Sequence, residues 1–215
     1  MPHRYRSDDD SPSDARTPSG LPRTVASDAM GVSVTFLRSA EESSDASVET
    51  EVVLKAGGQG PPLHMHTGFE ETFTTAQGVL WFDIGEQRAV QLSARQSVVV
   101  PIGLAHRYYN GGDQPVVFRF VARPGAAYER SIRAGFGREA AGRANRFGLP
   151  RNLLEAALVI EESDSFVVGM PLGLQRILVR LGAWFARRLG VQHRFDPYLT
   201  PQPDTHAEPV SGSNP

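Results

Sequence analysis

The pair His64 and His66 is the first feature of the sequence that could do chemistry. On a β-strand, alternate side chains point to the same face, so two imidazoles at this spacing face one side and can share one metal ion. Taken alone the pair is weak evidence, because two half-buried polar residues on a strand give the same pattern. The residues around the pair therefore decide between these two interpretations.

The composition limits the kind of site to which these histidines can belong. The 215 residues include 6 histidines and no cysteine, which excludes disulfides, zinc fingers, iron–sulfur clusters and cysteine nucleophiles. A metal site in this chain must therefore be built from histidines and carboxylates. The 22 basic and 24 acidic residues give a formal net charge of −2, which argues against a generally basic nucleic-acid binder.

Two groups of residues stand at fixed spacings around these histidines. The first group has the pattern G-x5-H-x-H-x4-E-x6-G and consists of Gly58, His64, His66, Glu71 and Gly78. The second has the pattern P-x-G-x2-H-x3-N and consists of Pro101, Gly103, His106 and Asn110. Together they resemble the two signature motifs of the cupin superfamily, and the chain looks like a small single-domain cupin. The resemblance covers residues 58–110 by motif and about 31–122 by strand pattern.

The resemblance implies a metal centre inside a small barrel. Carried over position by position, it makes His64, His66, Glu71 and His106 the ligands of one divalent cation. Three imidazoles and one carboxylate suit Fe(II) or Mn(II), which we favour, and also Zn, Ni, Co or Cu. An octahedral ion held in this way keeps about two positions open for water, substrate or dioxygen. Glu71 is also the expected catalytic residue, because its carboxylate can leave the ion and act as a base.

Three positions near these motifs need a separate interpretation. Glu70 lies on the opposite face of a regular strand from Glu71, so we expect it to face solvent, with replacement of Glu71 as the alternative. Asn110 is expected to be a turn residue and not a ligand. The family motif usually has glycine six positions before Pro101, and this chain has Arg95 there. The turn at Arg95 must therefore form without the glycine that the family motif usually has there.

Side chains that share a face with the expected ligands outline a substrate pocket. On a regular strand, Phe73 and Thr75 lie on the same face as Glu71, and Tyr108 lies on the same face as His106. The strand pattern of residues 79–84 leaves open which of its faces points inward. The expected pocket residues are Phe73, Thr75, Trp81, Tyr108, Phe118 and Phe120. Because most of them are aromatic, and no glycine-rich phosphate loop is present, the pocket favours a small, partly hydrophobic organic substrate.

Short alternating segments separated by glycines fill the middle of the chain. The nine expected strands are Val32–Leu37, Val48–Leu54, Leu63–Thr67, Glu71–Ala76, Val79–Ile84, Arg88–Leu92, Ser97–Pro101, His106–Tyr109 and Val116–Val121. Many short strands with regular turn signals predict an all-β sandwich or barrel. With the family resemblance, the expected fold is a double-stranded β-helix, the jelly-roll barrel of the cupins, followed by C-terminal α-helices.

Composition divides the chain into four parts. We expect a disordered tail over residues 1–30, the cupin barrel over 31–125, a helical extension over 126–195 and a second disordered tail over 196–215. Within the extension, one helix is expected after Pro150. A second helix is expected between Pro171 and Gly190, because proline favours the first turn of a helix and glycine its end.

The segment 171–190 has two interpretations as an interaction surface. It carries four arginines, no acidic residue and the aromatic pair Trp184 and Phe185, so as a helix it can lie on an anionic membrane surface. We favour the commoner arrangement, in which the apolar stripe packs on the barrel, on the preceding helix or on a partner subunit. The expected partners are a small molecule and a second copy in a homodimer, and not a nucleic acid. Without a secretory signal or a spanning segment, cytoplasmic localisation is the default expectation.

Three classes of function remain in competition. The leading one is a mononuclear-metal enzyme of the oxygenase type that acts on a small organic substrate, with an isomerase or a decarboxylase as alternatives. The second is a non-catalytic module that binds a metal or a small ligand, for which the ligand residues would look the same. The third is a docking protein in which the helices act and the barrel is scaffold. It ranks last because all four expected ligands are present.

Overall fold

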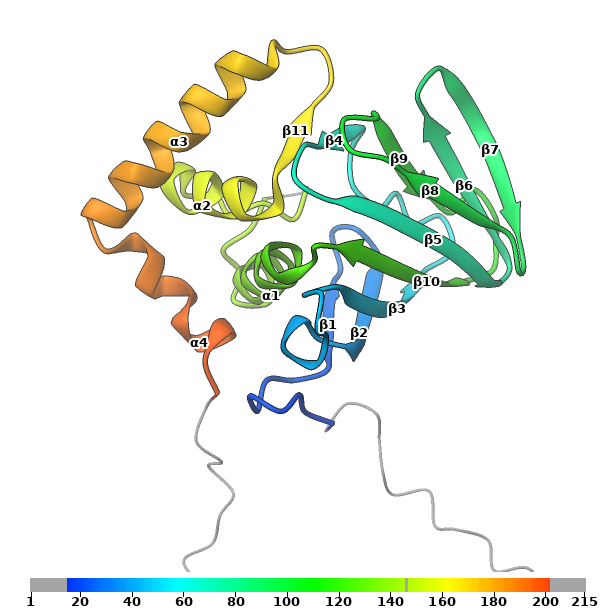
Figure 1. The fold of residues 1–215 in the computed structure, drawn as a ribbon, viewed down its shortest axis with the longest axis horizontal. Helices are drawn as coiled ribbons and strands as arrows, with labels where there is room; N and C mark the ends of the chain where they lie inside the picture. The colour runs from blue at the N-terminus through cyan, green and yellow to red at the C-terminus, as the bar shows by residue number, and fades with distance from the viewer. Residues whose placement is uncertain (1–14, 146, 202–215) are drawn as a thin grey trace, which may run out of the picture.

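Two antiparallel sheets face each other, and the helices gather on one side of them (Figure 1). The computed structural model describes residues 15–145 and 147–201. The six-stranded sheet has the order β1-β2-β3-β10-β5-β8, and the five-stranded sheet has the order β11-β4-β9-β6-β7. This arrangement confirms the expected cupin fold.

The strands of the first sheet are β1 (Thr24–Ser27), β2 (Val32–Arg38), β3 (Val48–Leu54), β5 (Glu70–Gln77), β8 (Ser97–Val100) and β10 (Val116–Arg123). Those of the second are β4 (His64–His66), β6 (Val79–Ile84), β7 (Gln87–Ser93), β9 (His106–Tyr109) and β11 (Ser165–Val167). All nine expected strands are present, with bounds that differ from the expected ones by no more than two residues. The period-2 alternation located them because each strand buries one face.

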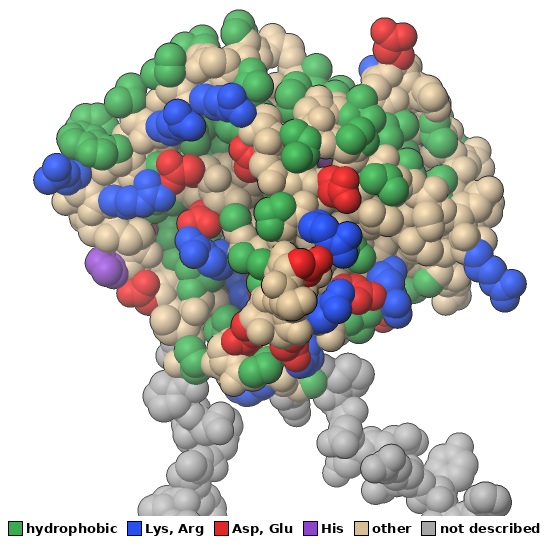
Figure 2. Space-filling view, in the orientation of Figure 1, with side chains coloured by type: hydrophobic (Ala, Val, Ile, Leu, Met, Phe, Trp, Pro, Cys, Tyr) green, Lys and Arg blue, Asp and Glu red, His purple; other side chains and the backbone are tan. Residues whose placement is uncertain are grey.

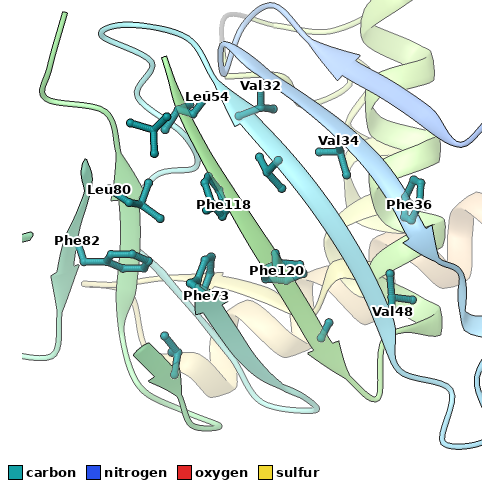
Figure 3. Close-up of a cluster of buried hydrophobic side chains, with 14 of the residues drawn as sticks. Val32, Val34, Phe36, Val48, Leu54, Phe73, Leu80, Phe82, Phe118 and Phe120 are labelled. Atoms are coloured by element: carbon teal, nitrogen blue, oxygen red, sulfur yellow. The ribbon is translucent and has the colours of Figure 1, made fainter. Parts of the chain in front are cut away.

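The main core lies between the two sheets. In β10, Phe118 and Phe120 are buried while Arg119 between them is exposed, as alternation requires. Figure 3 shows these rings and Phe73 of β5 facing Leu80 and Phe82 of β6 in the opposite sheet. Each such side chain contributes about 1.5–3 kcal/mol by leaving water. The dense aromatic packing holds the two sheets at a fixed separation, and the strands that carry the expected ligands belong to both of them.

Two strands lie outside the range expected for the barrel. Strand β1 falls inside the segment 1–30 that composition assigned to a tail, and it pairs with β2 from Thr24 opposite Thr35 to Ser27 opposite Val32. The folded body therefore begins earlier than expected, because an edge strand needs backbone pairing more than large apolar side chains. Strand β11 comes from the helical extension and pairs with β4, so the extension joins the barrel sheet. Residues 1–14 and 202–215 lie outside the described residues.

Four α-helices follow the barrel, namely α1 (Ala126–Ala140), α2 (Leu153–Ser163), α3 (Leu172–Arg188) and the short α4 (Asp196–Leu199). The side chain of Asn152 accepts hydrogen bonds from the backbone N–H groups of Leu154 and Glu155, which explains why α2 begins there. Helix α4 lies in the segment 196–215 that was expected to be a tail. Among the described residues, no helix is both long and apolar enough to cross a membrane.

Buried ion pairs attach the helices to one another and to the barrel. Glu155 of α2, which is only 1% exposed, accepts two hydrogen bonds from Arg138 of α1 and one from Arg194. Arg133 of α1 pairs with Glu129 and lies over the ring of Phe36 in β2, 4.1 Å from its centroid. Removing one member of such a pair leaves an uncompensated buried charge, which is strongly destabilising. The helices are therefore held in a fixed position against the sheets.

Candidate metal centre

The three barrel histidines and Glu71 come together from opposite sheets. His64 and His66 are the two ends of β4, and His64 lies opposite His106 of β9 in the strand register. Glu71 belongs to β5 in the facing sheet. All four side chains are buried, with His106 only 1% exposed. The alternation of β4 and β5 thus points His64, His66 and Glu71 into the space between the sheets, where they meet the buried His106 of β9.

The distance between the first two histidines suits two ligands of one ion. The Nε2 atoms of His64 and His66 lie 3.0 Å apart. Two nitrogens bound at about 2.1 Å and at right angles around an octahedral ion are about 3.0 Å apart. One ring nitrogen from each of His64, His66 and His106 lies within 4.8 Å of the others. These residues fit a divalent cation by geometry as well as by type.

Backbone carbonyls fix which nitrogen of each histidine carries the proton. The Nδ1 atoms of His64, His66 and His106 lie 2.8, 3.0 and 3.1 Å from the carbonyl oxygens of Pro62, Ser163 and Leu104, respectively. A carbonyl oxygen only accepts hydrogen bonds, so Nδ1 must be the donor in each case. In the neutral tautomer that this fixes, Nε2 is the ring nitrogen that can bind a metal ion. His64 and His66 place these two nitrogens 3.0 Å apart, so a cation between them would be bound by both.

Glu71 completes the arrangement from the opposite sheet. Its Oε1 lies 3.4 Å from Nε2 of His66, and its Oε2 lies 2.6 Å from Nε2 of His106. The second contact has the length of a hydrogen bond but not its direction, and both of its atoms are buried without a hydrogen-bond partner. Orphaned buried polar atoms are costly. A metal ion shared by Glu71 and the histidines would remove that cost.

The electrostatics of the site favour the protonation states that metal ligands need. Burial lowers the pKa of His64 to about 3, and the neighbouring imidazoles of His66 and His106 lower it further. Burial alone would raise the pKa of Glu71, but the two close imidazoles hold it down at about 2. At neutral pH His64 is therefore neutral and Glu71 is ionised.

The structure also places the three other residues that the motifs singled out. Glu70 is half-buried on the opposite face of β5 from Glu71, away from the histidines. Asn110 is buried and organises a turn, since its Nδ2 donates to the carbonyl oxygens of Lys55 and Gln114. Arg95 stands where the family has glycine, and it adopts the left-handed conformation with a φ of 71°. A turn with positive φ is thus retained without its usual residue.

A cavity of about 200 Å³ opens beside the metal centre. His64, His66 and Glu71 form part of its wall. Of the expected pocket residues, Tyr108, Phe118 and Phe120 line it, which agrees with their assignment. Phe73 and Thr75 are buried on the inner face of β5 but do not line the cavity. Phe73 instead packs between the rings of Phe82 and Phe120.

Trp81 was assigned to the pocket wrongly. Strand β6 buries Leu80 and Phe82, so Trp81 faces outward, where it is half-exposed and its ring lies 6.1 Å from that of Tyr109. The strand pattern alone left open which face of β6 points inward. The packing of Phe82 against Phe73 and Tyr108 makes that choice.

Much of the cavity wall comes from the helical extension, which sequence reasoning missed. The wall residues of α1 and α2 include Tyr128, Ile132, Phe136, Val159, Ile160 and Ser163. Tyr128, Ile132 and Phe136 recur every four residues, so their helical spacing was a readable signal. Their contact with the barrel could not be predicted, because the spacing of apolar residues along a helix does not indicate which surface the helix covers.

The polar groups of the cavity are few and mostly neutral. Burial raises the pKa of the Tyr108 and Tyr128 hydroxyls, so both stay protonated at neutral pH. Neither hydroxyl has a hydrogen bond to any residue that the structure describes. The described lining residues include no lysine or arginine. Apart from a bound metal ion, the cavity therefore offers hydrogen-bond donors to a neutral ligand and no cationic side chain to bind an anion.

Comparisons with known proteins agree with this fold. Residues 50–122 match the family model described as Cupin domain. A structure described as a sugar phosphate isomerase from a cupin superfamily, from Silicibacter pomeroyi, is 22% identical with a TM-score of 0.40. The alignment covers 44% of this chain and 61% of that one, so this chain spans less than two thirds of its length.

Two further solved structures are similar at the same level. The polyketide cyclase RemF from Streptomyces resistomycificus is 21% identical with a TM-score of 0.41, over 58% of this chain and 80% of that one. A predicted oxalate decarboxylase from Thermotoga maritima is 22% identical with a TM-score of 0.40, over 43% and 79%. The comparison with curated proteins found no match. We draw no conclusion about activity from likenesses at this level.

Proposed function

Because residues 50–122 are a cupin domain, we propose that the chain is a mononuclear-metal enzyme of the oxygenase type. Its substrate would be a small, neutral and mostly apolar organic molecule held in the cavity. One observation carries the proposal: ring nitrogens of three buried histidines converge beside an apolar cavity. Such a site binds a cation and admits an organic molecule next to it.

The residues that would hold the metal are His64, His66, His106 and Glu71. Their neutral imidazoles and single carboxylate favour Fe(II) or Mn(II) and also accept Zn, Ni, Co or Cu. When bound, such an ion supplies a Lewis-acidic or redox-active centre with open coordination positions. Glu71 contributes a negative charge that offsets part of the charge of the cation. As an ionised carboxylate, it can also accept a proton from a substrate O–H or C–H group.

The cavity supports a neutral and apolar substrate. Its wall is built mainly from aromatic and aliphatic side chains, with Phe118 and Phe120 from the barrel and Ile132 and Phe136 from α1. The described wall has no cationic side chain, so apart from the metal ion itself nothing there would hold the charge of a phosphate or a 2-oxo acid. The hydroxyls of Tyr108 and Tyr128 instead suit a carbonyl or hydroxyl oxygen. A small phenol or ketone combines an apolar body with such an oxygen atom.

Oxygen consumption with protein reconstituted with Fe(II) or Mn(II) tests the proposal. The probes are a panel of neutral phenols and ketones, with phosphate esters and 2-oxo acids as the contrasting set. We expect uptake with members of the neutral set only, and its loss in His64→Ala. Turnover that persists without dioxygen would assign isomerase or decarboxylase chemistry instead. Saturable binding of a neutral probe without turnover on any metal would identify a non-catalytic binding module.

A further inference from the structure

Helix α3 is apolar on two opposite faces. One face packs on α2 through small residues, since Ala183 and Ala186 are fully buried and Gly182 lies against Ala157. The other face, which we call the α3 apolar face, consists of Leu174, Ile177, Leu178, Leu181, Trp184, Phe185 and Leu189. These side chains are each 48–69% exposed. The interior of the protein thus uses only one of the two faces.

The exposure of this face exceeds what a folded domain normally tolerates. Single exposed apolar residues are ordinary, but a continuous row of seven marks an interaction surface. Packing on the preceding helix, one of the arrangements that we favoured from the sequence, accounts for the alanine face only. No other residue that the structure describes covers the α3 apolar face. Figure 2 shows hydrophobic side chains and arginines together along the upper left edge of the molecule, over α3.

The charges beside this face have one sign. Helix α3 contains Arg176, Arg180, Arg187 and Arg188 and no acidic residue. Arg187 pairs with Glu161 of α2. Among the described residues, no carboxylate pairs with Arg180 or Arg188, both of which are exposed. The guanidinium of Arg188 lies 5.2 Å from the ring centroid of Trp184, within the apolar face itself. The face therefore combines exposed apolar area with unpaired positive charge.

We propose that the α3 apolar face docks on an anionic membrane surface, with the helix axis parallel to the bilayer. The apolar side chains would enter the boundary between head groups and acyl chains, and Arg180 and Arg188 would contact lipid phosphates. Trp184 and Phe185 suit this boundary because aromatic rings concentrate there.

Charge argues against a second copy of the chain as the occupant. A two-fold axis through the centre of α3 would lay two such helices antiparallel, with the same residues on both sides. Arg180 would then lie near its own copy, and α3 offers no carboxylate to compensate it. Like charges in a buried interface are costly. An anionic lipid surface supplies the missing negative charge without such a conflict.

Vesicle flotation of the full chain tests the proposal. The vesicles contain phosphatidylcholine alone or phosphatidylcholine with phosphatidylglycerol, and the variant Ile177→Glu places a charge in the α3 apolar face. Val99→Glu is the matched control, because Val99 is 53% exposed on the barrel and Ile177 is 58% exposed. We expect the wild type and Val99→Glu to float with anionic vesicles, and Ile177→Glu to stay at the bottom. Equal thermal unfolding of both variants would show that their folds are intact.

Fluorescence gives an independent readout at the proposed contact. The chain has two tryptophans, so Trp81→Phe leaves Trp184 as the only one. Its emission should shift to shorter wavelength with anionic vesicles and not with neutral ones. Replacing both Arg180 and Arg188 with glutamine should weaken binding about 30-fold, and salt should weaken binding of the wild type.

Three results would overturn the proposal. One is the absence of flotation of the wild type, and another is unchanged flotation of Ile177→Glu. The third is a dimer in light scattering that Ile177→Glu converts to a monomer, combined with no vesicle binding. That combination would assign the α3 apolar face to a second copy of the chain.

Discussion

The Nδ1 atom of His66 donates a hydrogen bond to the carbonyl oxygen of Ser163, 3.0 Å away. Ser163 is the last residue of α2, so the end of a helix fixes the orientation and the tautomer of an expected metal ligand. Strand β11 follows directly and pairs with β4, with Ser165 opposite His66 and Val167 opposite His64. The helical extension therefore helps to position the candidate metal ligands.

Asp164 strengthens this connection. It ends α2 in the left-handed conformation, and its carboxylate accepts hydrogen bonds from the N–H and the hydroxyl of Thr67, the residue after His66. Arg176 of α3 donates to the same hydroxyl at 2.8 Å. These contacts hold the end of β4 between two helices. The position of His66 thus depends on residues about one hundred positions later in the chain.

The first prediction concerns this connection. Asp164→Gly keeps the left-handed backbone available and removes the carboxylate, so it should loosen β4 and reduce metal affinity about tenfold. Asp164→Asn retains one acceptor oxygen and should stay closer to the wild type. Competition of the apoprotein with a chromophoric chelator measures the affinity. Asp113→Ala, at an exposed site, is the control, and equal affinities for Asp164→Gly and the control would refute a positioning role.

Metal removal provides the second prediction. A ligand that binds only the folded state at 100 times its Kd stabilises that state by about 2.7 kcal/mol. For a chain of this length the corresponding change in Tm is about 5–10 °C. Scanning calorimetry with and without a chelator should show this drop in the wild type and none in His64→Ala. An unchanged Tm for the wild type would mean that no ion contributes to its stability.

The third prediction compares two glycines of α1. At Gly135, which lines the cavity, a Cβ atom would sit 3.8 Å from Val159, an ordinary contact, so Gly135→Ala should stabilise the protein by about 0.5–1 kcal/mol. At Gly137 a Cβ atom would lie 2.3 Å from Tyr198, so Gly137→Ala should destabilise it by about 1–3 kcal/mol. Urea unfolding of both variants checks the signs. The same sign for both would contradict the described packing of α1.

The sequence was sufficient for features that repeat along short stretches of chain. Alternation located the nine strands, and the motif spacings selected Glu71 over Glu70 and put His64, His66 and His106 together. Each of these signals lies within the strands that carry it. No pattern within β6 indicated which of its faces points inward. Trp81 was therefore wrongly predicted to line the pocket.

Features formed between distant segments were not visible in the sequence. The hydrogen bond from His66 to Ser163 joins residues 97 positions apart, and β11 is only three residues long. The cavity wall contributed by α1 depends on contacts such as that of Arg133 with the ring of Phe36, which attach that helix to β2. Nothing in the composition of residues 130–151 indicated that Arg133 and Arg138 are buried partners of carboxylates. Tertiary contacts, and not local propensity, determine these features.

We propose that the three histidines and Glu71 hold one metal ion. The metal-to-protein ratio after reconstitution with Fe(II) or Mn(II) and removal of free metal tests this most sharply. We predict one ion per chain for the wild type and none for His64→Ala, with intact folding of both. The matched variant Glu70→Gln should keep one ion, because Glu70 faces away from the site. A wild type that retains no ion, or a His64→Ala protein that retains the same amount, would contradict the account.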